Sequence, residues 1–148
     1  MSINVNKLWS VEAEAGVIGS ILLEPECLHK IITILPDENV FYDSENRKIY
    51  SVLLNLKHTH RALWNGDEGG RLTPVPTSKD DAIFAFTREK RRDRMLVILN
   101  LSSASQTFSL RGRTAPGSYR DAFSNHAMTV SVKDKITLGP WEYRVLIR

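Results

Sequence analysis

The sequence predicts an α+β protein, with a small helical bundle of about three helices over residues 1–58 packed on a C-terminal antiparallel Greek-key β-sandwich over residues 59–148. Two changes near position 60 indicate this division. Apolar residues recur every three or four positions before it, as in helices, and alternate after it, as in strands. The charge balance also changes, because residues 1–60 hold 5 Lys/Arg and 8 Asp/Glu whereas residues 61–148 hold 15 and 9. We therefore expect two units of different architecture.

A first helix is expected over residues 11–23. Ser10 precedes this segment, and Glu12 and Glu14 lie in its first turn. A hydroxyl can therefore cap the helix while the carboxylates favour the positive end of its dipole. Pro25 follows the segment, which is typical of a helix stop.

Two further helices are expected before position 60. The third is capped by Asp43 or Ser44 and extends to about His58. The second ends before Pro36, and its buried side consists of Cys27, Leu28, Ile31, Ile32 and Leu35.

Three small residues in these helices need a structural explanation. Gly16 and Gly19 are costly inside a helix, so we attribute them to close packing with another helix. Cys27 is the single cysteine, which excludes an internal disulfide and leaves a zinc site without partners. We expect it to be a small buried hydrophobic residue.

Short β-branched and aromatic runs, separated by Pro and Gly, predict strands in the second half. Residues 82–88 and 95–101 are apolar on both sides, which is typical of the central strands of a sandwich. The basic tract 88–94 between them is expected to be a solvated hairpin turn. The seven expected strands lie near residues 82–88, 95–101, 106–111, 118–123, 128–132, 135–138 and 142–147.

Residues 10–28 and the Phe-Tyr segment at 41–50 resemble the opening helices of the N-terminal domain of DnaB-type replicative DNA helicases. The resemblance covers residues 8–56, about the first half of that domain. Helicase activity would need an ATPase motor with a Gly-x-x-x-x-Gly-Lys-Ser/Thr phosphate loop, and the sequence contains no such motif. We therefore expect no helicase activity.

Five ordered blocks lie in the second half, at residues 61–66, 83–89, 96–102, 119–124 and 138–146. Through them the chain from about residue 57 to 148 resembles the C-terminal all-β domain of the alpha-amylase family of glycoside hydrolases. That resemblance implies a sandwich that packs on a catalytic barrel and carries no catalytic group. A barrel needs about 250 residues, so a full barrel enzyme is excluded here. We expect no enzyme activity.

Because the two halves resemble unrelated families, we interpret the chain as a fused or engineered chimera with a structural, non-catalytic role. Each half then has an apolar surface that its relatives cover with another domain. The main hypothesis is that the helices, through Leu53 and Leu56, cover the face that a barrel would cover. Self-association through these surfaces is the other way to bury them, which leaves open a helicase-derived assembly module.

A further alternative is an accessory module with weak α-glucan affinity. Sugar rings have an apolar C–H face that stacks on an exposed aromatic ring. The candidate rings are Trp64, Tyr119, Trp141 and Tyr143. Packing is the competing interpretation, since Trp141 and Tyr143 alternate with the strand that follows and Trp64 ends a helix.

Other candidate sites have simpler explanations. Paired carboxylates can act as acid and base in glycosidases, but nothing near these pairs provides a cleft or a raised pKa. His58 and His60 lie two apart, so on a helix they cannot chelate one metal. Acidic residues interrupt the basic tract 88–94 and no aromatic ring accompanies it, so specific nucleic-acid binding is not expected. The carboxylate pairs are Glu12 and Glu14, Glu24 and Glu26, and Asp80 and Asp81.

The sequence predicts no cofactor and no metal. No run approaches the roughly 20 apolar residues of a membrane span, and residues 1–9 lack the pattern of a secretory signal. We therefore expect no membrane partner and a cytoplasmic location.

Overall fold

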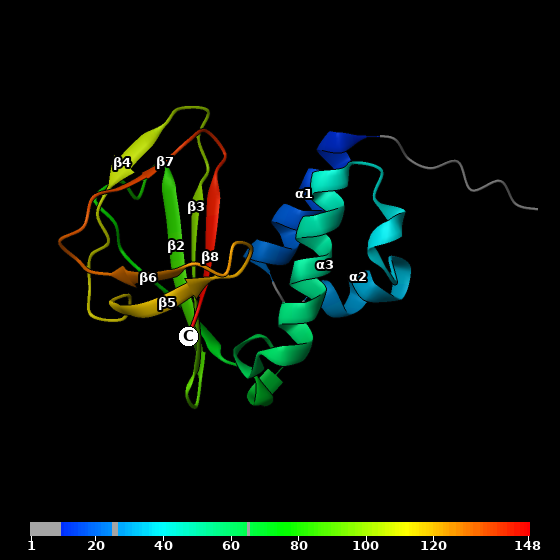
Figure 1. The fold of residues 1–148 in the computed structure, drawn as a ribbon, viewed down its shortest axis with the longest axis horizontal. Coiled ribbons are helices and arrows are strands. Elements are labelled where there is room, and N and C mark those ends of the chain that lie inside the picture. The colour runs from blue at the N-terminus through cyan, green and yellow to red at the C-terminus, as the bar shows by residue number, and fades with distance from the viewer. Residues whose placement is uncertain (1–9, 25–26, 65) are drawn as a thin grey trace, which may run out of the picture. The chain divides into compact units, whose positions relative to one another are not determined.

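The computed structural model describes residues 10–24, 27–64 and 66–148. Two compact units are present, one ending at Thr59 and one comprising His60–Arg148. The first contains helices and the second contains strands, which confirms the α+β class (Figure 1).

The described part of the helical unit contains three α-helices, as predicted: α1 (Val11–Leu23), α2 (Leu28–Ile34) and α3 (Ser44–Thr59). Ser10 caps α1, because its side chain accepts a hydrogen bond from the Ala13 N–H at 3.2 Å. Helix α1 packs on α3, and the short 3-10 helix η2 (Glu38–Val40) contacts α3 as well. The Tyr50 ring on α3 is fully buried, and its hydroxyl donates to the Leu35 carbonyl at 2.7 Å.

The prediction that Gly16 and Gly19 allow close packing with another helix is wrong. A Cβ atom built on Gly16 or Gly19 would meet no atom within 4 Å. Neither glycine therefore provides room for a close helix contact. Cys27 is half-buried rather than buried and precedes α2 as its N-cap residue.

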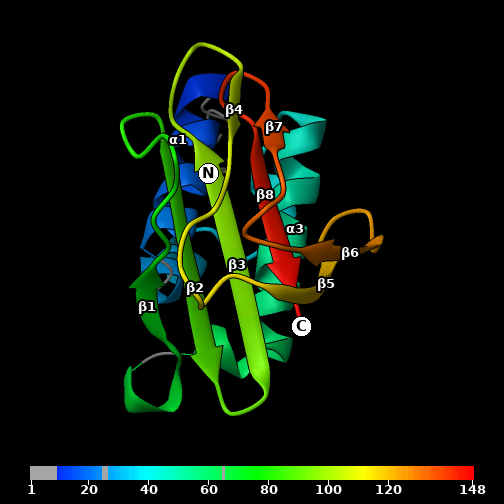
Figure 2. The same cartoon turned by 90° about the vertical axis from the view of Figure 1, so that its left-hand side faces the viewer.

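The described residues of the second unit form eight strands. Six form one antiparallel sheet in the order β1-β2-β3-β8-β5-β6, and β4 and β7 form a separate pair. Figure 2 shows β2, β3 and β8 as the long neighbouring strands at the centre of this sheet. The strands are β1 (Arg71–Pro74), β2 (Ile83–Lys90), β3 (Asp93–Asn100), β4 (Gln106–Phe108), β5 (Gly117–Asp121), β6 (Ala127–Val130), β7 (Ile136–Leu138) and β8 (Tyr143–Ile147).

The seven strands expected from the sequence are all present, and β1 was missed. β1 is a four-residue edge strand that ends in Pro74, and its residues are mostly exposed. A short exposed edge strand carries no apolar alternation, so no signal in the sequence marks it.

One face of the sheet forms the core with the β4–β7 pair. This hydrophobic core cluster contains alternating residues of the central strands, as expected when one face of a sheet packs in a sandwich. Its members are Val75, Ile83, Ala85, Leu96, Ile98, Phe108, Leu110, Ala115, Tyr119, Val130, Ile136, Leu138 and Leu146.

The opposite face of the central strands is also apolar. The register places Phe86 of β2 opposite Val97 of β3, and Val97 opposite Val145 of β8. None of these three belongs to the core cluster, because side chains alternate between the two faces of a strand. We call the row Phe86, Val97 and Val145 the second face.

The expectation that residues 88–94 form a solvated turn is wrong for most of the tract. Only Arg91 and Arg92 form the turn between β2 and β3, with Arg91 at φ 60°. Arg88 is buried, and its guanidinium donates to the Gly70 carbonyl at 2.8 Å and to the Trp64 carbonyl at 3.4 Å. The Arg88 side chain therefore holds the segment that precedes β1 against β2.

The segment that precedes β1 contains two short 3-10 helices, η3 (Arg61–Leu63) and η4 (Gly66–Glu68). Within the sheet unit, η3 contacts both β2 and β3. Asp93 anchors it, because one carboxylate oxygen accepts from the Ala62 N–H at 2.8 Å and the other lies 2.6 Å from His60 Nδ1.

Candidate functional site

Trp141 is the most exposed of the four candidate rings for glucan binding. Its side chain is 64% exposed, and its backbone has φ 58°, the left-handed region that bulky residues rarely adopt. Strand β8 begins only at Tyr143, so Trp141 lies in the preceding turn. The expectation that it continues the alternating face of this strand is therefore wrong.

The remaining three rings are less available. Tyr119 is only 3% exposed, and its hydroxyl donates to the Ala115 carbonyl at 2.9 Å, so the predicted glucan contact does not fit its position. Tyr143 is half-buried and packs edge-on against Phe123, with ring centroids 5.6 Å apart. Trp64 is half-buried, and the Arg61 guanidinium lies 5.2 Å from its ring centroid.

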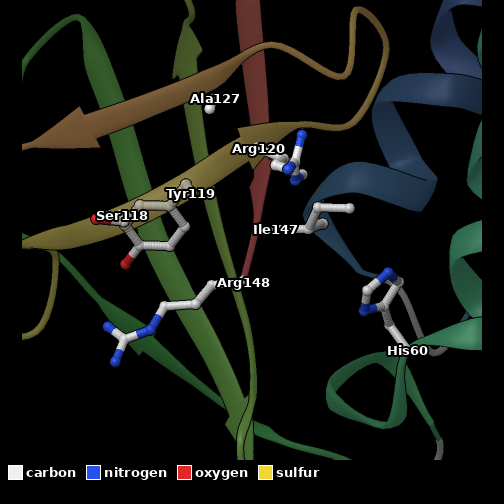
Figure 3. A pocket seen from close by; sticks show the side chains of 7 residues that line it. All are labelled: His60, Ser118, Tyr119, Arg120, Ala127, Ile147 and Arg148. Atoms are coloured by element: carbon white, nitrogen blue, oxygen red, sulfur yellow. The ribbon is translucent and has the colours of Figure 1, made fainter.

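A pocket of about 390 Å³ opens at the end of β5 and β8, lined in part by Arg120, Ile147 and His60 (Figure 3). Arg120 Nη1 donates to the Asn125 carbonyl at 3.3 Å. Figure 3 shows the Arg148 guanidinium directed away from His60, toward Tyr119. The basic groups of this pocket therefore do not converge on one point. Its lining residues are His60, Ser118, Tyr119, Arg120, Ala127, Ile147 and Arg148.

Ser118 and His60 both line this pocket, and His60 is hydrogen-bonded to Asp93 outside the lining, which invites comparison with a hydrolytic triad. A triad needs the serine hydroxyl within hydrogen-bond reach of the imidazole. Asp93 does lie 2.6 Å from His60 Nδ1. Ser118, however, lies on the other side of the pocket from His60, with Tyr119 and Ile147 between them in Figure 3. Figure 3 therefore does not place the Ser118 hydroxyl against the His60 imidazole.

Two of the candidate carboxylates, Glu14 and Asp80, have structural partners. Glu14 is buried and accepts hydrogen bonds from the backbone N–H groups of Tyr42 and Asp43, just before α3. The hydroxyl and backbone N–H of Thr77 both donate to Asp80, and these bonds hold the pKa of its carboxyl below the ordinary value of 3.8. Glu26 and the side chain of Glu12 lie outside the described residues. None of these contacts resembles an acid–base pair.

The histidines differ from each other. His58 is exposed near the end of α3, as expected, whereas His60 is hydrogen-bonded to Asp93. Within the described ranges, no group of three or more His, Cys, Asp or Glu side chains is placed to hold a metal ion. No helix in the described part of the chain is long and apolar enough to cross a membrane.

The predicted interface residues Leu53 and Leu56 are both buried side chains of α3. Sequence reasoning missed the links made by Arg88 and Asp93, which join residues 18 to 33 positions apart. No local pattern marks such pairs, because they join the segment before β1 to strands β2 and β3 only in the folded chain.

Two protein families match separate parts of the chain. Residues 6–63 match the DnaB-like helicase N terminal domain, and residues 74–145 match the maltogenic amylase C-terminal domain. The resemblance to both families, one in each unit, is thus confirmed. A search of curated protein sequences gave no match.

Solved structures of amylases and related enzymes share the fold at low sequence identity. The chain aligns with AmyP in complex with maltose (18% identity, TM-score 0.56), covering 70% of this chain and 20% of AmyP. It also aligns with the maltogenic alpha-amylase AmyB from Thermotoga neapolitana (15%, TM-score 0.58), covering 73% and 26%. A third match is the gamma-CGTase from Alkalophilic bacillus clarkii, at 19% identity and a TM-score of 0.58. This alignment covers 74% of this chain and 17% of that enzyme. The chain therefore spans about a quarter or less of each of these enzymes.

Proposed function

We propose that the chain is a non-catalytic, fused or engineered protein in which the helicase-like helical unit covers the second face of the amylase-like sheet. The row Phe86, Val97 and Val145 carries this proposal, because three neighbouring strands present apolar side chains away from the sandwich core. A solvated face of an antiparallel sheet would instead carry polar residues. An apolar face of this kind needs a cover.

The helical unit supplies a chemically suitable cover. Leu53 and Leu56 lie three positions apart on α3, so they share one side of the helix. A non-catalytic role is supported by the match of residues 74–145 to an amylase C-terminal domain, because the chain spans only about a quarter or less of each aligned enzyme.

A double-mutant cycle tests the contact directly. Leu53→Ala and Phe86→Leu each destabilise the protein, and their combined effect should differ from the sum by about 0.5–3 kcal/mol if the two side chains share a packed interface. Phe108→Leu is the matched control, because Phe108 is a buried phenylalanine in the sandwich core. Its effect should add to that of Leu53→Ala within about 0.5 kcal/mol. Additivity for Phe86→Leu as well would refute the proposal.

Light scattering separates this arrangement from an assembly module. A constant monomer mass across about a hundredfold range of concentration is expected when one chain covers its own surfaces. A mass that rises to a dimer would mean that the apolar surfaces are shared between copies, as the helicase-derived assembly alternative predicts.

A further inference from the structure

A carboxylate orients the His60 imidazole through one of its two ring nitrogens. His60 Nδ1 lies 2.6 Å from one oxygen of Asp93, and the other oxygen accepts from the Ala62 N–H at 2.8 Å. An ionised carboxylate only accepts hydrogen bonds, so Nδ1 carries the proton. In the neutral ring the lone pair therefore resides on Nε2, which is the nitrogen that Asp93 leaves available for chemistry.

His60 also lines the pocket at the end of β5 and β8, and its side chain is 22% exposed (Figure 3). The lining includes two further basic side chains, Arg120 and Arg148, and its seven residues include no Asp or Glu. The volume of about 390 Å³ lies in the range of about 300–1,000 Å³ that is typical of small-molecule sites. The pocket should therefore attract a small anion.

The basic groups are arranged for a brief encounter with an anion rather than for tight binding. The Arg148 guanidinium is directed away from His60, and Arg120 Nη1 already donates to the Asn125 carbonyl at 3.3 Å. These groups can attract an anion but do not enclose it. An oriented imidazole at the edge of such a pocket is suited to attack an anion that is itself electrophilic.

We propose that His60 Nε2 is a phosphoryl acceptor for a small acyl phosphate. The Nε2 lone pair attacks phosphorus, an N–P bond forms, and the P–O bond to the acyl group breaks, so that a carboxylate leaves with the electron pair. The ring then carries a positive charge with its proton on Nδ1, and the Asp93 carboxylate stabilises this charge. All of these groups belong to the sheet unit, so the site does not depend on the role proposed for the helices.

Incubation of the full chain with acetyl phosphate tests this site. We expect mass spectrometry at neutral to alkaline pH to find one phosphoryl group on His60 and none on that position in His60→Gln. His58→Gln is the matched control, because His58 is exposed two positions away and its replacement should leave the labelling rate unchanged. Absence of a label in the parent chain, or equal labelling of His58 and His60, overturns the proposal.

Asp93 acts through His60 and is a positioning residue. Asp93→Asn should slow labelling by about tenfold, because an amide that donates to Nδ1 moves the ring proton to Nε2. The chemical shifts of the His60 ring nitrogens, measured by NMR, should show this change of tautomer, which a loss of stability alone would not produce. Asp81→Asn, at an exposed carboxylate, is the control and should change neither quantity. An unchanged labelling rate in Asp93→Asn overturns this role of Asp93.

A neutral reagent separates the reactivity of the imidazole from the attraction of the anion. Diethyl pyrocarbonate acylates imidazole nitrogens and carries no charge. Arg120→Gln should therefore slow labelling by acetyl phosphate several-fold and leave the rate with diethyl pyrocarbonate unchanged. Arg71→Gln, at an exposed position of β1, is the matched control and should change neither rate. An unchanged rate with acetyl phosphate in Arg120→Gln would overturn the choice of an anionic donor.

Discussion

The Asn46 side chain donates from Nδ2 to the Glu14 carboxylate at 3.1 Å, which joins α1 to α3 across 32 positions of sequence. The same carboxylate accepts from the backbone N–H groups of Tyr42 and Asp43, at 2.5 and 3.2 Å. Glu14 is only 7% exposed, so these three donors replace the water that it lost on burial. Glu14 was expected only to favour the dipole of α1, but it also binds the residues at and just before the N-terminus of α3.

Replacing Glu14 should therefore destabilise the helical unit. Glu14→Gln keeps the shape but turns an amide N–H₂ toward donors, so we expect a loss of about 2 kcal/mol in the free energy of unfolding, measured by urea denaturation. Glu45→Gln is the control, because Glu45 pairs with Lys48 at the surface and should change stability by less than about 1 kcal/mol. Equal losses in the two variants would contradict this role of Glu14.

Replacing Gly16 or Gly19 of α1 should stabilise the protein, because there is room for a side chain at both positions. Gly16→Ala and Gly19→Ala should each raise the free energy of unfolding by about 0.5–1 kcal/mol, because alanine restricts the unfolded chain and its Cβ meets no atom here. Gly70→Ala is the contrasting control, since its Cβ would lie 2.7 Å from Glu89 backbone atoms. It should be destabilising. Thermal unfolding of the three variants checks this, and a lower Tm for both α1 variants would reject it.

Arg88 should contribute to stability through its buried hydrogen bonds. Arg88→Met keeps the aliphatic stem but leaves the Gly70 carbonyl without this donor, so we expect a loss of about 1–3 kcal/mol. Arg92→Met is the control. Arg92 lies in the exposed turn between β2 and β3, so this substitution should change the free energy of unfolding by no more than about 0.5 kcal/mol. Chemical denaturation of both variants measures the difference, and a small effect at Arg88 would mean that water replaces the guanidinium.

Asp80 should make the sheet unit sensitive to acid. Hydrogen bonds from Thr77 lower the pKa of the Asp80 carboxyl in the folded state, so the ionised form is favoured by folding. The resulting stability is present above the ordinary pKa of 3.8 and is lost as the pH falls through the lower folded value.

Thr77→Val tests this coupling, because it removes the hydroxyl donor and keeps the side-chain shape. The pKa of Asp80, followed by NMR, should move up toward its ordinary value, and the variant should lose less stability than the parent on acidification below about pH 4. An unchanged pKa would show that the backbone N–H of Thr77 alone accounts for the shift.

Apolar spacing identified the three helices and seven of the eight strands, since each is long or regular enough to show a period. Helix α1 has the predicted bounds, Val11–Leu23. The strand β1 and the inner position of Arg88 were missed because an edge strand and a buried cation leave no periodic trace. The same limit applies to the candidate site, where the sequence named four rings but did not distinguish exposed Trp141 from buried Tyr119.

The sequence by itself determined the α+β class, the change from helices to strands near position 60 and the resemblance of each unit to a different family. These properties depend on local periodicity and on ordered blocks of residues, which are present before folding. Only the tertiary structure decided the partners of Glu14, Arg88 and Asp93 and the exposure of Trp141. Those depend on strand register, turn geometry and contacts between distant segments, which exist only once the chain is folded.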